Sequence, residues 1–331
     1  MIFAASGNEY NLCKTSEFQV FKLPVVSVNS SIQDSLNETK FEINLLRFLD
    51  PDVVVSDNHN EAILAAKYLG IPSVAICDLP PILLFPVYAV FADLILIPQI
   101  PQGLIIPDYL LKVNEKVRVV GPILDEECFK QMEKINLDPS GPKEKERMIV
   151  VYASRNIAER KQYLNLILST YKMIKKMRPD DKLVLIGPGL TQETEIESLT
   201  GLIIHDYVPS LIKYISESDL FITRAPVSAM EAIALGIPTI IIPISGDIHQ
   251  KTISHRLNDL GVLSHFDLRK TTPKFFKEKI NILLSDDETR TRIIDKGRSL
   301  MSVSGGKKSA ELILDAFKTP DSWKRYSDEI P

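Results

Sequence analysis

The sequence predicts an α/β fold built from two doubly wound, Rossmann-like domains with parallel sheets. Three observations carry this expectation. Short apolar runs of strand length alternate with longer helix-forming stretches, the order found where helices cover both faces of a parallel sheet. A charged, loop-like segment at 125–147 separates two such halves. The length of 331 residues is sufficient for two domains with separate cores.

The first domain is predicted at residues 1–124 and the second at 148–305, joined by the linker 125–147. Apolar runs in the first domain predict strands at 2–5, 18–23, 53–56, 73–76, 94–97 and 117–120. Helices are expected there at 32–49, 60–69 and 82–92. The apolar loop 80–86 is expected to pack in the core, because no Lys or Arg lies between Lys67 and Lys112 to hold a membrane surface.

The second domain repeats the alternation. Strands are predicted at 148–152, 182–186, 202–205, 220–222 and 239–242. Residues 306–331 are expected to form terminal helices that pack back on the first domain: one at 307–317 after Gly305-Gly306, and a short one that contains Trp323.

Composition excludes several classes of protein. The formal net charge of −4 argues against a nucleic-acid partner, which would require a basic face. Three widely spaced cysteines form neither a metal motif nor a disulfide framework, so a reducing compartment is expected. The first residues do not resemble a secretory signal, and no stretch approaches the ~20 apolar residues that span a bilayer. A cytoplasmic location is therefore expected.

Residues 219–261 are the most informative part of the chain. They read twice as strand, polar loop and helix. Pro226 opens the first helix where a missing N–H costs nothing, and Gly236 ends it. The next strand, 239–242, is apolar and β-branched. Two polar loops therefore lie at the carboxyl ends of parallel strands, where open α/β sheets bind ligands.

The side chains of these loops suit a nucleotide sugar. Ser228 and Glu231 are three residues apart and share one helix face, where a carboxylate can accept from sugar hydroxyls. Arg224 and the N–H groups of the helix start suit an anion. A second polar cluster follows the next strand: Asp247, His249 and Gln250.

These residues resemble the carboxyl-terminal donor domain of GT-B glycosyltransferases. The nearest groups are the bacterial peptidoglycan N-acetylglucosaminyltransferase and the UDP-glucuronosyltransferase-like enzymes. The family's donor motif is filled in order by Asp219, Glu231, Gly236, Pro238, Pro243, Gln250 and Gly261. The resemblance implies that Glu231 binds the ribose hydroxyls and Gln250 the donor sugar. It also implies that the stretch with Tyr207 and Val208 holds the nucleotide base.

The chain departs from the family pattern at two phosphate-binding loops. Ala225-Pro226 stands where the family has a pair of small residues, mostly glycine. The loop after strand 148–152 contains Ser154 and Arg155 where the family often has Gly-Ser. Arg155 is expected to replace a backbone contact to the diphosphate with a side-chain fork.

The resemblance implies transfer of a hexose or N-acetylhexosamine from a UDP-sugar to an acceptor hydroxyl, with inversion. No cofactor is expected. No metal is expected either, because the chain has no Asp-x-Asp suited to a divalent ion. Related enzymes act on lipid-linked or glycan acceptors, which would place the protein at the inner membrane face. The rival hypotheses are a non-catalytic donor-binding subunit or scaffold, and a sugar-nucleotide epimerase.

The front of the chain is expected to lack one unit of this architecture. Met1 falls where the family's second strand begins, so the first strand, Gly-rich loop and helix are missing from the predicted sheet. Three explanations stay open: a truncated gene start, a sheet that closed over the gap, or a second polypeptide that completes the sheet. In the last case the partner is another chain or a second copy of this one.

His59 is the candidate catalytic base, held by Asp57 at the carboxyl end of strand 53–56. The competing interpretation makes Asn58 or Asn60 a helix cap. Arg224 has a similar alternative, an ion pair with a neighbouring loop.

Overall fold

The structure is a computed structural model. It describes residues 2–5, 19–22, 32–77, 87, 90–98, 114–134, 146–153, 157–193 and 200–317. The chain divides into two compact units. The first comprises Met1–Ile97, Ile106–Arg118 and Glu311–Pro331, and the second comprises Pro98–Ile105 and Val119–Ala310.

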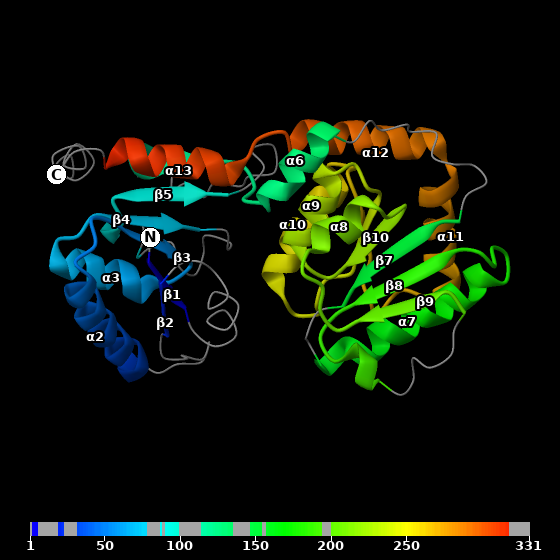
Figure 1. The fold of residues 1–331 in the computed structure, drawn as a ribbon, viewed down its shortest axis with the longest axis horizontal. Helices are drawn as coiled ribbons and strands as arrows, with labels where there is room; N and C mark the ends of the chain where they lie inside the picture. Colours follow the sequence, from blue (N-terminus) through cyan, green and yellow to red (C-terminus); the bar gives the residue numbers. More distant parts are fainter. Residues whose placement is uncertain are drawn as a thin grey trace. The chain divides into compact units, whose positions relative to one another are not determined.

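The first unit contains two separate parallel sheets (Figure 1). Strands β1 (Ile2–Ala5) and β2 (Gln19–Lys22) form one. The other has the order β3 (Val54–Asp57), β4 (Ser73–Ile76), β5 (Leu94–Ile97) and β6 (Val117–Val119). Within the described residues no ladder joins β1 to β3, and Val55 on β3 is 46% exposed. Strand β3 is therefore only half covered, whereas every residue of β5 is buried.

Helices α2 (Ile32–Leu49) and α3 (Asn60–Leu69) pack on each other in this unit. Helix α3 ends at Gly70, whose φ of 71° gives the left-handed cap that a glycine adopts without strain. Both helices occupy the ranges that periodicity predicts. A short 3₁₀ turn, η2 (Asn114–Lys116), precedes β6.

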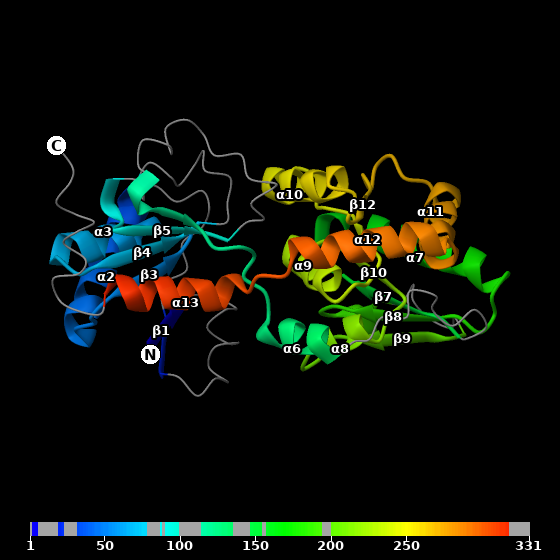
Figure 2. The same ribbon diagram turned by 90° about the horizontal axis from the view of Figure 1, so that it is seen from above.

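The second unit is a doubly wound sheet of order β12-β11-β10-β7-β8-β9. The strands are β7 (Met148–Tyr152), β8 (Lys182–Ile186), β9 (Leu202–His205), β10 (Leu220–Thr223), β11 (Thr239–Ile241) and β12 (Ser264–His265). Every neighbouring pair in this sheet is parallel. Figure 2 shows β7, β8 and β9 running side by side.

The helices of the second unit are α6 (Glu126–Lys134), α7 (Ile157–Lys175), α8 (Leu211–Ser216), α9 (Pro226–Ala234), α10 (Ile248–Asp259), α11 (Pro273–Ser285) and α12 (Asp287–Leu300). The turn η3 (Leu190–Gln192) follows β8, and helix α13 (Gly305–Ala316) follows α12.

Alternate residues of each strand supply two cores. Ile149 and Val151 of β7 face one core together with helices α7 and α11, whereas Val150 faces the other with α8 and α9. This two-sided burial explains why these strands read as continuous apolar runs rather than as alternating ones.

Two sequence expectations need correction here. The first concerns the linker 125–147, predicted as loop-like, where residues 126–134 form helix α6. Cys128, Phe129 and Met132 gather on one side of that helix and pack into the cores beside α8 and α9. The second concerns Gly305, which begins α13 rather than preceding it; a Cβ there would lie 2.2 Å from the Gly121 carbonyl oxygen.

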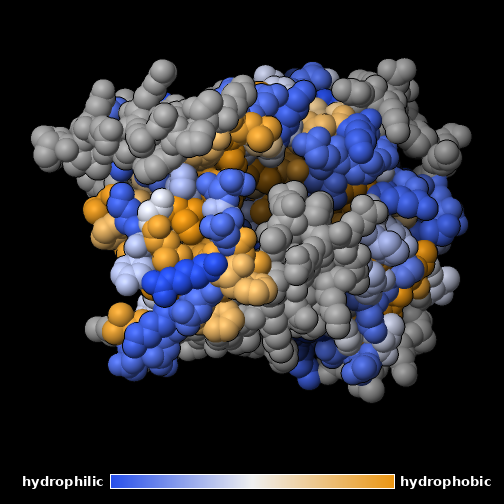
Figure 3. All heavy atoms as spheres, turned by 60° about the vertical axis from the view of Figure 1, so that its left-hand side comes forward, coloured by the Kyte–Doolittle hydropathy of each residue, from blue (hydrophilic) through white to orange (hydrophobic). Residues whose placement is uncertain are grey.

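Three predicted features lie wholly or mostly outside the described residues: the loop 80–86, the helix 82–92 and the helix with Trp323. Within the described part of the chain, no helix combines the length and the apolar character needed to cross a bilayer. Figure 3 shows hydrophilic and hydrophobic residues interspersed on the face that it draws.

Candidate functional site

The candidate site lies where the strand order of the second unit changes direction. From β7 the chain adds β8 and β9 on one side, then returns to place β10, β11 and β12 on the other. The connections that follow β7 and β10 therefore diverge at the carboxyl ends of these strands, the usual ligand position in doubly wound sheets. The polar loop after β10, predicted to bind the donor, is at this point.

Arg224 has a protein partner at this switch point. Its side chain is 1% exposed and donates a 2.6 Å hydrogen bond to Glu159 Oε2, in the first turn of α7. The guanidinium also stacks over the Tyr163 ring, 5.2 Å from its centroid. The ion pair with a neighbouring connection, the alternative expected for Arg224, is therefore present, and contact with a phosphate stays a prediction.

Glu159 joins three connections of the sheet. Besides Arg224, it accepts a 3.0 Å hydrogen bond from the Ser245 N–H in the loop after β11. Burial by itself raises the pKa of Glu159, but the hydrogen bonds from Ser245 and the pairing with Arg224 outweigh it and bring the pKa to about 2. The carboxylate is therefore ionised at neutral pH and holds the loops after β10 and β11 to the first turn of α7.

The N-terminus of α9 has no side-chain cap. Helices α8, α10, α11 and α12 each have a side-chain cap, whereas Ala225 at the N-cap of α9 supplies none. The Thr223 hydroxyl accepts from the Ala225 N–H instead. Uncapped N–H groups at a helix start attract anions through the helix dipole.

Ser228 does not share the surface that the sequence predicts for it. Its hydroxyl lies 2.8 Å from Thr223 Oγ1 and donates to the Ala225 carbonyl at 3.1 Å, and the residue is 5% exposed. These bonds tie the first turn of α9 to the end of β10. Ser228 therefore helps to hold the loop, and its binding of the donor stays a prediction.

Glu231 is half-buried on α9, and its carboxylate lies 3.5 Å from the Asp125 N–H. Burial raises the pKa of Glu231 to about 7. The hydrogen bond from the Asp125 backbone N–H lowers this pKa, whereas the negative charge of the Asp125 side chain raises it further. Near neutral pH this carboxyl group can therefore both accept and donate hydrogen bonds.

The polar cluster after β11 shapes its own loop. Asp247 is the N-cap of α10 and accepts from the Gln250 N–H, and Gln250 Oε1 accepts from the Ile244 N–H at 3.0 Å. His249 lies in the first turn of α10 and is half-buried. The structure thus brings Asp247 and Gln250 together through contacts within the loop, and their role in donor binding stays a prediction.

The loops after β8 and β9 also meet. Asp206 accepts from the Thr191 N–H, the turn role that competes with base binding in this stretch. Tyr207 is 72% exposed, and Val208 packs partly into the core. The absence of a side chain at Gly187 lets it approach the Ala153 carbonyl, since a Cβ would lie 2.2 Å from that oxygen. Ser154 and Arg155 lie outside the described residues.

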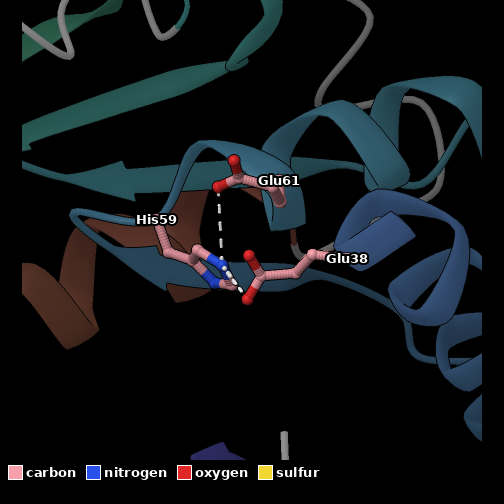
Figure 4. Close-up of side chains that lie close together, drawn as sticks. All are labelled: Glu38, His59 and Glu61. Carbon is pink, nitrogen blue, oxygen red and sulfur yellow. Dashed lines mark hydrogen bonds and ion pairs between the residues drawn. The ribbon is translucent and has the colours of Figure 1, made fainter. Parts of the chain in front are cut away.

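In the first unit, His59 is surrounded by glutamates (Figure 4). Its Nε2 lies 3.2 Å from Glu38 Oε1 and 3.5 Å from Glu61 Oε2, and its Nδ1 lies 3.3 Å from Glu42 Oε1. Asp57 is exposed and accepts from the Asn58 side chain instead. The N-cap of α3 is His59 itself, without a side-chain cap, so neither asparagine caps the helix.

Sequence reasoning missed Glu159, Glu38 and Glu42. Nothing local singles out Glu159, because its partners are 65 and 86 residues away. Glu38 and Glu42 did leave a signal. They are four residues apart on the face of α2 that becomes buried, where apolar residues are normal.

Comparison with known proteins places these observations in a family context. A family model described as glycosyl transferases group 1 matches residues 133–300. The uncharacterized UDP-glucosyltransferase YojK of Bacillus subtilis (strain 168) is 24% identical over 207 residues, 62% of this chain and 48% of the relative. The NDP-glycosyltransferase YjiC of the same strain is 28% identical over 151 residues, 44% of this chain and 38% of the relative. The matched regions thus span less than half the length of either relative.

Solved structures share the fold. The Acinetobacter baumannii MurG structure superposes with a TM-score of 0.64 at 15% identity, over 94% of this chain and 89% of that one. The calicheamicin glycosyltransferase CalG4 superposes with a TM-score of 0.68 at 15% identity, over 96% of this chain and 90% of that one. The UDP co-structure of S. aureus MnaA superposes with a TM-score of 0.66 at 12% identity, over 100% of this chain and 98% of that one. The predicted α/β class with two parallel-sheet units, in the GT-B arrangement, is confirmed.

Proposed function

The chain belongs to the glycosyl transferases group 1 family, and from this membership we propose that it transfers a hexose or N-acetylhexosamine from a UDP-sugar to an acceptor hydroxyl. The acceptor oxygen forms a bond to the anomeric carbon from the face opposite UDP while the bond to UDP breaks, so the configuration inverts. The names of the two B. subtilis relatives support a nucleotide-linked donor.

The observation that carries the proposal is the uncapped N-terminus of α9 at the switch point. In the proposed complex its N–H groups receive the diphosphate and stabilise the charge that develops as UDP departs. This use of a helix end needs no divalent metal at the leaving group. Arg224 acts indirectly, because its pairing with Glu159 fixes the loop from which α9 starts.

Glu231 is the proposed ribose partner. A carboxyl group with a pKa near 7 can accept from one ribose hydroxyl and, when protonated, donate to the other. Gln250 is proposed to contact the donor sugar through its amide group, whose oxygen already orders the loop after β11. Tyr207 and Val208 are proposed to line the base.

The proton of the acceptor hydroxyl needs a base, and His59 stays the predicted one. The carboxylates that would orient its imidazole are those of Glu38, Glu42 and Glu61 rather than Asp57. If His59 serves as the base, His59→Ala should lose turnover while retaining its affinity for UDP.

A second candidate function is a donor-binding subunit whose partner completes the first unit. The separation of β1–β2 from β3–β6 favours this candidate, because a strand supplied between them would join the two sheets. The two functions differ in two measurements: a subunit alone binds UDP but releases none from a UDP-sugar, and its native mass rises when the partner is added.

Calorimetric titration of the full chain with UDP tests the donor site. Glu231→Ala should weaken UDP binding by about 10- to 100-fold, because a hydrogen bond to a charged group contributes roughly 1.5–3 kcal/mol. Glu278→Ala, an exposed acidic position on α11, is the matched control and should bind like the wild type. Equal affinity of the Glu231 and Glu278 variants would refute the ribose assignment.

A further inference from the structure

The cluster around His59 contains more negative charge than its histidine can balance. Three carboxylates, from Glu38, Glu42 and Glu61, surround one imidazole. Glu38 and Glu42 are 7% and 4% exposed. Within the described residues, the ion pairs of these glutamates involve His59 and no Lys or Arg. Buried charge without a partner is strongly unfavourable, so a bound cation would stabilise the ionised form of this cluster.

The side chains already converge as metal ligands do. Glu38 Oε1, His59 Nε2 and Glu61 Oε2 lie within 4.8 Å of one another, and the three side chains point toward a common centre in Figure 4. Ligand atoms about 2.1 Å from a tetrahedral ion are roughly 3.4 Å apart. The distances from Nε2 to the two carboxylates, 3.2 and 3.5 Å, have this spacing.

The groups behind the ligands match those that support metal sites. Glu42 Oε1, 3.3 Å from Nδ1, can accept the Nδ1 proton and leave the Nε2 lone pair free. The Ser35 hydroxyl donates to Glu61 Oε1 and orients that carboxylate. Metal-bound histidines and carboxylates are normally held by such second partners.

A buried carboxylate oxygen behind His59 is unsatisfied. Among the described residues Glu42 Oε2 has no hydrogen-bond partner, although only 4% of the residue is exposed, and its Oε1 faces His59 Nδ1. A bound cation would supply the attraction that these carboxylates lack.

We infer that Glu38, His59 and Glu61 form a site for a divalent first-row transition-metal ion, with Glu42 as the positioning residue behind His59. One imidazole nitrogen with two carboxylates favours Mn²⁺, Fe²⁺, Co²⁺ or Zn²⁺ over Mg²⁺ or Ca²⁺, which prefer oxygen ligands alone. The ion would join α2 to the start of α3. This site lies in the first unit, outside the donor-binding residues. While the ion is bound, His59 Nε2 is not available to act as the base proposed above, so that role belongs to the metal-free protein.

The test is titration of the chelator-treated full chain with Co²⁺, followed by visible absorbance and by the thermal unfolding midpoint. Wild-type protein should bind one equivalent and gain thermal stability. Glu38→Gln and Glu61→Gln should each weaken Co²⁺ binding by more than tenfold, because even loss of a supporting partner typically costs about 10- to 100-fold. Absence of stoichiometric binding in the wild type, or unchanged affinity in both variants, would overturn the site.

His255→Gln is the matched control. The His255 and His265 rings lie 4.0 Å apart in the second unit and form another place where Co²⁺ could collect. Loss of binding in His255→Gln, with Glu38→Gln unaffected, would assign the ion to that pair and refute the inference. Misfolding is checked without metal: a neutral amide is easier to bury than a carboxylate, so Glu38→Gln should melt no lower than the wild type. Each variant should keep its affinity for UDP.

Discussion

Arg224 and Glu159 form a buried ion pair, with Nη2 and Oε2 2.6 Å apart, that links the end of β10 to the first turn of α7. The pair crosses the switch point of the second sheet. Ser245 adds the loop after β11 to the same carboxylate. Three connections that bear on the donor site therefore share one anchor, and the first prediction concerns its strength.

Removal of the carboxylate should destabilise the second unit. Glu159→Ala leaves the Arg224 guanidinium buried without its partner, which typically lowers the free energy of unfolding by about 3–5 kcal/mol. Arg269→Ala is the control, since that 71% exposed side chain lies 3.7 Å from the same carboxylate; its loss should cost less than about 1 kcal/mol. Urea unfolding measures both. Similar losses in the two variants would show that the buried pair is not the anchor.

The same carboxylate predicts acid sensitivity. The folded-state pKa of Glu159, about 2, lies below its ordinary value of 4.5. Its contribution to stability is therefore complete above pH 4.5 and is lost as the pH falls from 4.5 toward 2. Stability curves of wild type and Glu159→Gln should converge over that interval. Parallel curves from pH 6 to pH 3 would contradict the low pKa.

A cap on α9 should separate stability from donor binding. Ala225 has the extended N-cap conformation, φ −97° and ψ 125°, so Ala225→Asp can place a carboxylate over the free N–H groups. Such a cap typically stabilises a helix by about 1 kcal/mol, while its charge repels a diphosphate. We expect a higher melting temperature together with UDP binding at least tenfold weaker, measured by calorimetry. Unchanged UDP affinity in a stabilised variant would place the diphosphate elsewhere.

The raised pKa of Glu231 predicts that its contribution to stability changes with pH in the opposite direction to that of Glu159. Because its folded-state pKa is raised from 4.5 to about 7, the unfolded chain loses this proton first. Stability should therefore decrease as the pH rises from 4.5 through 7. Glu231→Gln should match the wild type near pH 4 and exceed it at pH 8, in denaturant titrations at both values. A variant less stable than the wild type at pH 8 would show that the carboxylate is not destabilised by burial.

Gly187 should tolerate no side chain. In Gly187→Ala the new Cβ would meet the Ala153 carbonyl oxygen at 2.2 Å and push the end of β7 away from β8, with a cost of about 1–3 kcal/mol or more. Gly189→Ala is the control: no atom lies within 4 Å of its Cβ, and only its φ of +70° is unfavourable. Only the Gly187 change should also weaken UDP binding. Equal UDP affinities would separate this contact from the donor site.

The sequence determined the elements and their class because those signals are local. Strand 73–76 and helix 32–49 were predicted at the bounds that β4 and α2 have, since apolar periodicity and run length depend on neighbouring residues only. Local patterning was weaker at 126–134, where charged residues concealed the few apolar positions that make α6 a packed helix.

Partner choice was decided by tertiary structure. The sequence offered Arg224 a phosphate or a neighbouring carboxylate, and the parallel pairing of β7 with β10 brought Glu159 to it. Packing of α2 on α3 likewise gave His59 the carboxylates of Glu38 and Glu42 in place of Asp57. A chain fixes which groups it carries, but Coulomb and hydrogen-bond energies fall steeply with distance. Only the fold sets those distances, and with them which charge each group meets.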